Sequence, residues 1–129
     1  MSLSSNTSVL VIDDVASTRA LLMDMLTELG ISRCFEASDG SEALEVLKGC
    51  EVDLILCDYL MEGMSGIDFL NSLKAVSEKT PPVLLVSALG DVSSVETAIG
   101  LGACDYLVKP VSFRKLRRKV ESALAPSQW

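Results

Sequence analysis

Four short apolar runs, each followed by a polar residue, most strongly constrain how this chain can fold. The runs and their following residues are 9–12 with Asp13 and Asp14, 54–57 with Asp58, 83–86 with Ser87, and 106–108 with Lys109. Short apolar runs between turn residues are typical of strands buried on both faces of a parallel sheet. Ligands bind beyond the carboxyl ends of such strands, so this sheet edge is the expected functional site.

Helical patterns separate the strands. Apolar spacing predicts helices over 15–29, 41–48, 69–73, 92–99 and 113–124, and a further short strand over 33–37. Ser112 is the expected N-cap of the last helix, because its hydroxyl can accept from a free backbone N–H. Right-handed crossovers place helices on both faces of a parallel sheet. The sequence therefore predicts an α/β fold, a doubly wound five-stranded sheet in a three-layer αβα arrangement.

Length and composition fit one domain. The chain has 129 residues and is 49% hydrophobic, which excludes a disordered chain. We expect a disordered lead-in over 1–7, the domain over 8–125 and a tail over 126–129. No apolar stretch approaches the roughly 20 residues of a membrane helix, and no secretory signal is present, so we expect no membrane contact.

Cysteine, histidine and charge restrict the chemistry. The four cysteines lack CxxC spacing and predict buried free thiols in a reducing compartment, hence a cytoplasmic protein. Histidine is absent, which removes histidine metal sites, Ser-His-Asp catalysis and a phosphohistidine on this chain. The net charge of −7 disfavours direct binding of nucleic acid.

The polar residues of the sheet edge suggest phosphate chemistry. Asp13, Asp14 and Asp58 would repel one another unless a cation offset them, and Mg²⁺ prefers oxygen ligands of this kind. Asp58 follows a central strand and is the candidate nucleophile, since carboxylates form aspartyl phosphates. Lys109 would contribute positive charge and Ser87 a hydroxyl donor to the phosphoryl oxygens.

These residues also stand in the order and spacing of a known family. The chain resembles the CheY-like receiver domain of two-component response regulators through Asp13, Asp14, Asp58, Ser87, Ala88, Tyr106, Lys109 and Pro110. The loop over 58–66 is similar to that family's loop after the phosphoacceptor. The resemblance covers about residues 8–125. It implies a flavodoxin-like (βα)5 fold with strand order 2-1-3-4-5.

The resemblance implies a phosphorelay function. A histidine kinase or a histidine phosphotransfer protein would supply the phosphoryl group, and Asp58 would accept it with Mg²⁺ bound. Asp14, Asp58 and the backbone carbonyl of Leu60 would bind the metal, and Asp13 would act on it directly or through water. Ser87 and Tyr106 would then shift as switch residues and change the partner-binding surface. The chain would catalyse only its own phosphorylation and dephosphorylation, so we do not expect a conventional enzyme.

The output is left open by the sequence. The partner that reads the switch is either a separate downstream protein or a covalently attached effector domain. Phosphorylation-dependent formation of a homodimer is compatible with the sequence but not required by it.

Other interpretations also stay open. A pure interaction module would keep the fold without accepting phosphate, although the intact Asp58 and Lys109 argue against it. A haloacid-dehalogenase-type phosphatase needs an Asp-x-Asp motif, whereas Asp13 and Asp14 are adjacent. Asp13 and Asp14 could simply cap a helix, and Tyr106 could serve packing alone. The basic cluster over 114–119 is either a solvated helix face or a docking patch for an acidic partner.

Overall fold

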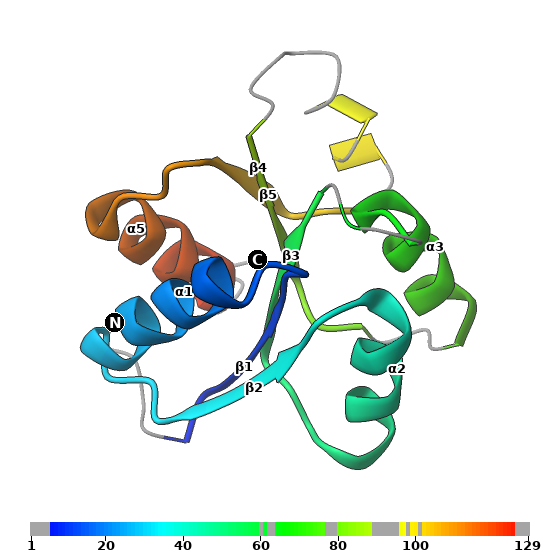
Figure 1. Ribbon diagram of the computed structural model, residues 1–129, viewed down its shortest axis with the longest axis horizontal. Coiled ribbons are helices and arrows are strands. Elements are labelled where there is room, and N and C mark those ends of the chain that lie inside the picture. The colour runs from blue at the N-terminus through cyan, green and yellow to red at the C-terminus, as the bar shows by residue number, and fades with distance from the viewer. Residues whose placement is uncertain are drawn as a thin grey trace.

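One five-stranded parallel sheet organises the chain in the order β2-β1-β3-β4-β5 (Figure 1). The computed structural model describes residues 6–59, 61, 64–76, 80–88, 96, 97, 99, 100 and 102–125. The strands are β1 Ser8–Ile12, β2 Arg33–Ala37, β3 Leu54–Asp58, β4 Val83–Ser87 and β5 Asp105–Val108. The labelled helices are α1 Ala16–Glu28, α2 Gly40–Gly49, α3 Gly66–Val76 and α5 Phe113–Leu124. The predicted fold class and strand order are confirmed.

Helices cover both faces of the sheet, with α1 and α5 on one side and α2 and α3 on the other (Figure 1). Alternate strand residues enter two separate cores. Val9 and Val11 contribute to the core beneath α1 and α5, whereas Leu10 and Ile12 contribute to the core beneath α2 and α3. Because successive side chains of a strand point to opposite faces, a strand covered on both faces must be apolar throughout.

Local hydrogen bonds fix where two helices begin. The Asp39 carboxylate accepts from the N–H of Glu42 at 2.8 Å, and the Glu42 carboxylate accepts from the N–H of Ser38 at 2.9 Å. Such reciprocal bonds satisfy N–H groups at a helix start that have no partner within the helix. At α5 the Ser112 hydroxyl accepts from the N–H of Lys115 at 3.2 Å, as the sequence predicted.

Two strands end one residue later than the apolar runs predicted. Asp58 and Ser87 are themselves the last residues of β3 and β4. Parallel pairing continues past them, because the N–H of Tyr59 donates to the Val86 carbonyl at 2.9 Å and that of Lys109 to the Ser87 carbonyl at 2.7 Å. The polar side chains at this edge are therefore fixed by the sheet itself.

One prediction, the burial of the cysteines, needs a correction, and others concern residues that the structure does not describe. All four cysteines are free thiols, but only Cys57 is buried; Cys34 and Cys50 are half-buried and Cys104 is exposed. Cys104 lies just before the edge strand β5, where one side lacks a neighbouring strand.

The helix predicted over 92–99 lies mostly outside the described residues, as do most of the lead-in and the tail. No helix in the described part of the chain is long and apolar enough to cross a membrane.

The packing of α1 on the sheet predicts unequal effects for two leucines of that helix. Leu26 is completely buried, whereas Leu21 is 54% exposed. We expect Leu26→Ala to lower the free energy of unfolding by about 2–5 kcal/mol, because it leaves a cavity. Leu21→Ala should change it by only about 0.5 kcal/mol. Urea denaturation followed by circular dichroism measures both, and equal losses would contradict this packing.

Candidate functional site

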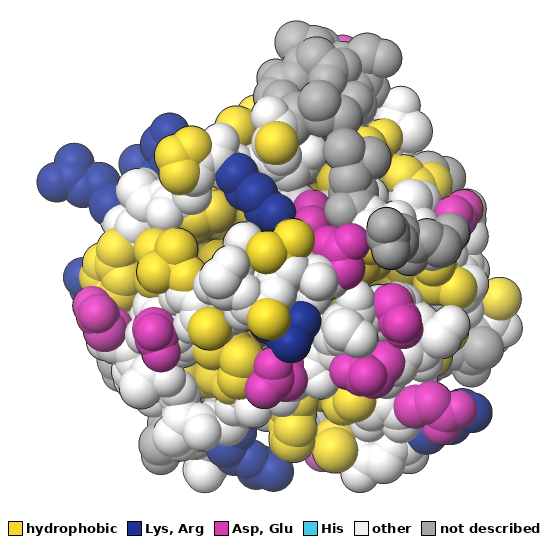
Figure 2. Space-filling model, in the orientation of Figure 1, with side chains coloured by type: hydrophobic (Ala, Val, Ile, Leu, Met, Phe, Trp, Pro, Cys, Tyr) yellow, Lys and Arg dark blue, Asp and Glu magenta, His cyan; other side chains and the backbone are white. Residues whose placement is uncertain are grey.

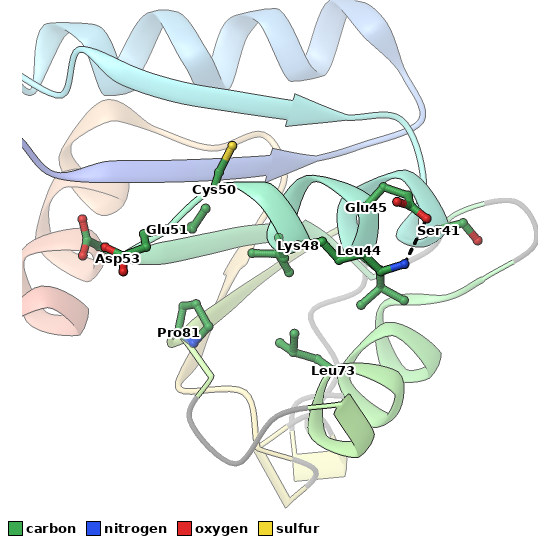
Figure 3. A pocket seen from close by; sticks show the side chains of 11 residues that line it. Ser41, Leu44, Glu45, Lys48, Cys50, Glu51, Asp53, Leu73 and Pro81 are labelled. Atoms are coloured by element: carbon green, nitrogen blue, oxygen red, sulfur yellow. Dashed lines mark hydrogen bonds and ion pairs between the residues drawn. The ribbon is translucent and has the colours of Figure 1, made fainter.

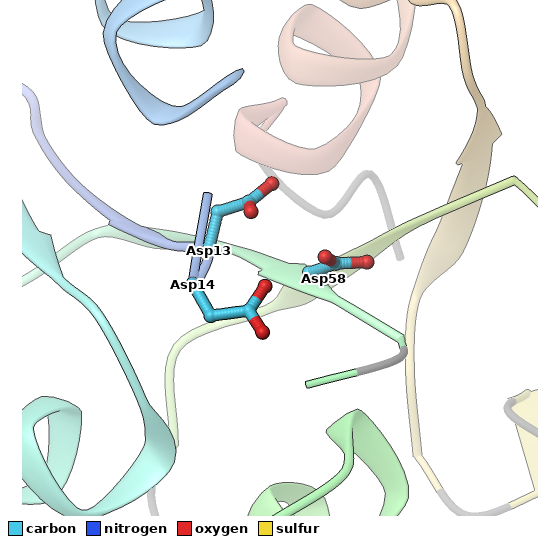
Figure 4. A group of neighbouring side chains, drawn as sticks. All are labelled: Asp13, Asp14 and Asp58. Atoms are coloured by element: carbon cyan, nitrogen blue, oxygen red, sulfur yellow. The ribbon is translucent and has the colours of Figure 1, made fainter. Parts of the chain in front are cut away.

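Three aspartates meet at the carboxyl edge of the sheet (Figure 4). Asp13 and Asp14 follow β1 and Asp58 ends β3, and these strands are adjacent and parallel with Ile12 opposite Cys57. One carboxylate oxygen of each aspartate lies within 4.8 Å of those of the other two. Asp13 is completely buried and Asp58 nearly so, while Asp14 is exposed. The fold thus concentrates negative charge at a partly open site.

Lys109 bridges two of these carboxylates. Its Nζ lies 3.3 Å from Oδ2 of Asp13 and 3.2 Å from Oδ2 of Asp58. Burial lowers the pKa of Lys109, but the charges of Asp58 and Asp13 and the hydrogen bonds to both outweigh burial and hold this pKa above its ordinary value. The lysine is therefore charged at neutral pH. It precedes Pro110 through a cis peptide bond.

Asp13 is held at every polar atom. Its N–H donates to the Ala37 carbonyl at 3.1 Å, and its Oδ1 accepts from the N–H of Val15 at 2.9 Å. Its carbonyl accepts from Nη1 of Arg19 at 2.6 Å, and its Oδ2 contacts Lys109. The N-cap of α1 is Val15, with no side-chain capping bond. Asp13 therefore does not occupy the N-cap position itself, and its carboxylate links the start of α1 to Lys109.

Ser87 and Tyr106 lie on the two strands beyond β3. Ser87 ends β4 and is buried, one residue past the partner of Asp58 in the register. Tyr106 on β5 is half-buried, and Nζ of Lys119 lies 4.8 Å from the centre of its ring. Lys119 also pairs with Asp105 at 2.8 Å. The ring of Tyr106 is thus tied to α5 rather than packed alone.

The donor set fits Mg²⁺. The site gathers three carboxylates, and the Lys109 ammonium pairs with two of them, so negative charge is in excess among these groups. Mg²⁺ favours such hard oxygen donors and is usually bound through one or two carboxylates, water and phosphate. The backbone carbonyl of Leu60, the remaining ligand expected from the sequence, lies outside the described residues.

A sizeable hollow lies away from the aspartate cluster and includes none of the three aspartates. This hollow of about 840 Å³ lies beside α2 and α3 at the amino ends of β3 and β4 (Figure 3). Lys48 and Glu45 form an ion pair of 3.2 Å at its rim. Asp53, which also lines it, accepts from the N–H of Ser8 at 2.9 Å, a bond that ties β1 to the start of β3. This hollow is at the opposite end of the strands from the aspartate cluster.

Comparison with known proteins agrees with the geometry. Residues 9–121 match the family model of the response regulator receiver domain. The chain belongs to this family. Chemotaxis protein CheY-3 of Vibrio cholerae is 34% identical over 120 residues, which is 92% of each chain. The transcriptional regulatory protein ZraR of Escherichia coli is 38% identical over 120 residues, covering 93% of this chain and 27% of ZraR.

A solved structure shares the fold closely. The CheX–CheY complex of Borrelia burgdorferi with BeF3 and Mg²⁺ matches with a TM-score of 0.87 and 29% identity, over 93% of this chain and 90% of that one. The chain is a CheY-like receiver domain of two-component signalling, as the sequence predicted. A phosphoacceptor role is consistent with this family, and the phosphatase interpretation is set aside.

The sequence did not predict the roles of Arg19, which contacts Asp13, and of Lys119, which contacts Tyr106. Arg19 was not singled out, although it falls one turn into the helix that follows Asp13 and Asp14. Lys119 was read only as part of the basic cluster. Figure 2 shows basic side chains gathered on the side where α5 lies. The basic residues of α5 are Arg114, Lys115, Arg117, Arg118 and Lys119.

The bridging lysine gives a prediction on stability. Lys109→Ala leaves two buried carboxylates facing each other, and breaking a buried ion pair costs about 3–5 kcal/mol. We expect a large loss of unfolding free energy without divalent cations and a partial recovery in Mg²⁺, because the ion offsets the same charges. Urea denaturation with and without Mg²⁺ measures this effect.

Lys48→Ala is the matched control for Lys109→Ala. Lys48 and Glu45 are exposed by 72% and 71%, so this pair contributes little in water. The control should be close to wild type in both buffers. A loss for Lys109→Ala that is unchanged by Mg²⁺ would contradict a shared charge site.

Cys57 gives a second prediction, on thiol reactivity. It immediately precedes Asp58, and burial, with the charges of Asp58 and Asp13, raises the pKa of its thiol. Burial and the charge of Asp105 also raise the pKa of the Cys104 thiol, but Cys104 is exposed whereas Cys57 is buried. Iodoacetamide should therefore leave Cys57 unmodified in the native protein while it labels Cys104, because the reagent must reach the reactive thiolate. Peptide mass spectrometry reports each site, and the unfolded chain should label at both. Equal labelling of Cys57 and Cys104 in the native protein would contradict the burial of β3 at this position.

Proposed function

We propose that Asp58 is the phosphoryl acceptor of this receiver domain. The observation that carries the proposal is its position: Asp58 ends the central strand β3, within the aspartate cluster and 3.2 Å from the Lys109 ammonium. Asp13 is a poorer candidate, because it is completely buried and both of its carboxylate oxygens already accept hydrogen bonds. Asp58 retains some exposure, so a phosphoryl donor can reach it.

The transfer follows from these side chains. An oxygen of the Asp58 carboxylate attacks phosphorus, the phosphorus–nitrogen bond of a phosphohistidine breaks, and the electron pair leaves with the donor imidazole. Lys109 turns from the carboxylate to an oxygen of the new acyl phosphate, and the Ser87 hydroxyl donates to another. Asp13 and Asp14, with Asp58, would hold Mg²⁺, which when bound offsets the negative charge of the phosphoryl oxygens.

The phosphoryl donor lies outside these 129 residues, because they contain no histidine. We propose a phosphohistidine of a histidine kinase or of a histidine phosphotransfer protein as the donor. The chain turns over only its own phosphoryl group. We assign the receiver domain to residues 8–125 and its place to the cytoplasm, since four free cysteines suit a reducing compartment.

We propose that β5 and α5 form the surface that changes on phosphorylation. Ser87 pairs with Val108 of β5, and Tyr106 on the same strand contacts Lys119 of α5. We therefore expect a shift of Ser87 toward the phosphoryl group to change the packing at this edge. The basic residues of α5 favour a downstream partner or effector domain with an acidic face. We propose Ser87 and Tyr106 as the switch residues of this change.

The acceptor assignment is tested by intact mass spectrometry. Acetyl phosphate with Mg²⁺ should add one phosphoryl group to the wild-type chain and to Asp24→Ala, a control that removes an exposed carboxylate on α1. Asp58→Ala should show no adduct. An adduct that persists in Asp58→Ala would move the acceptor elsewhere, and a folded wild type without any adduct would favour the interaction module.

A further inference from the structure

Arg19 joins two elements behind the aspartate cluster. Its Nη1 donates to the Asp13 carbonyl at 2.6 Å, and its Nε donates to Oε1 of Glu36 at 2.7 Å. The arginine side chain is 16% exposed, although Glu36 on β2 is 54% exposed. One guanidinium therefore connects α1, the end of β1 and the edge strand β2. Its planar fork is suited to bind two acceptors in fixed directions at once.

The Asp13 carbonyl lies at the point where the sheet gives way to the turn that carries both aspartates. The N–H of Asp13 is still bonded to β2, through the Ala37 carbonyl. Its carbonyl has left the strand ladder and is oriented by Arg19 instead. Since Asp14 follows through this same peptide group, the direction of that carbonyl also sets where Asp14 starts.

The geometry points to Arg19 as a positioning residue for cation binding. By donating to both the Asp13 carbonyl and the Glu36 carboxylate, Arg19 fixes the turn from which Asp13 and Asp14 extend their carboxylates. This inference rests on the proposed Mg²⁺ site. Arg19 touches neither the ion nor the phosphoryl group in this role. It acts through the backbone, as outer partners that orient metal ligands do.

If Arg19 acts through its charge or through positioning, its loss should change the affinity for Mg²⁺ in opposite directions. A guanidinium near a cation site repels the cation, so on charge alone Arg19→Ala should bind Mg²⁺ more tightly. If Arg19 positions the aspartates, the same substitution should weaken binding, by about tenfold as is typical for outer partners of metal ligands. The direction of the change therefore separates the two roles.

The test is the Mg²⁺ dissociation constant of the full chain, measured by isothermal titration calorimetry. Arg33→Ala is the matched control, because Arg33 is an exposed arginine on β2 and its loss makes the same change in net charge. We expect weaker binding for Arg19→Ala and unchanged or slightly tighter binding for Arg33→Ala. In phosphorylation by acetyl phosphate, Arg19→Ala should need more Mg²⁺ for half-maximal rate, with the rate at saturating Mg²⁺ largely kept.

Arg19→Lys keeps the charge without the planar fork and decides the matter if Arg19→Ala does not fold. Positioning predicts Mg²⁺ binding several times weaker than wild type, whereas a role of charge alone predicts wild-type binding. Wild-type or tighter affinity in the folded Arg19 variant would overturn the inference. A folded wild type that binds no Mg²⁺ would instead overturn the proposed function, so the two failures are distinguishable.

Discussion

The repulsion among three carboxylates at one sheet edge is the constraint on which the rest of this structure depends. Oxygens of Asp13, Asp14 and Asp58 lie within 4.8 Å of one another, two of these residues are buried, and a low local dielectric strengthens their repulsion. Lys109 offsets part of this charge by bridging Asp13 and Asp58. Such a cluster persists only when the surrounding fold holds it, and it favours the arrival of a cation.

The parallel sheet supplies that rigidity. Adjacent strands β1 and β3 place the aspartates side by side, and β5 returns Lys109 to the same edge. Both faces of the sheet are sealed by helices, so the strands have no freedom to slip without exposing a core. The edge strand β5 is also where Tyr106 meets Lys119 of α5, which connects the charged site to an outer surface. Charge chemistry at one position can thereby change a binding face at another.

The sequence predicted much of the fold because its signals are local. Apolar runs located the strands, and Ser112 marked the start of α5 by a capping bond that spans three residues. The meeting of the aspartates followed from the rule that parallel strands end at one edge. Arg19 was not predicted, because its partner Glu36 lies 17 residues away on strand β2 and no spacing pattern indicates such a contact between a helix and a strand. The prediction that Cys104 is buried was wrong, because this residue lies just before β5, which has a neighbouring strand on one side only.

The central claim is that these residues form one site for a divalent cation and a tetrahedral phosphoryl group. Its most direct test is fluorine NMR of the full chain with fluoroberyllate, an analogue of the phosphoryl group, in the presence and absence of Mg²⁺. The account predicts bound fluorine signals that require Mg²⁺ and vanish in Asp58→Ala. A folded wild-type sample that gives no bound signal with both additions, or the same signal without Asp58, would contradict it.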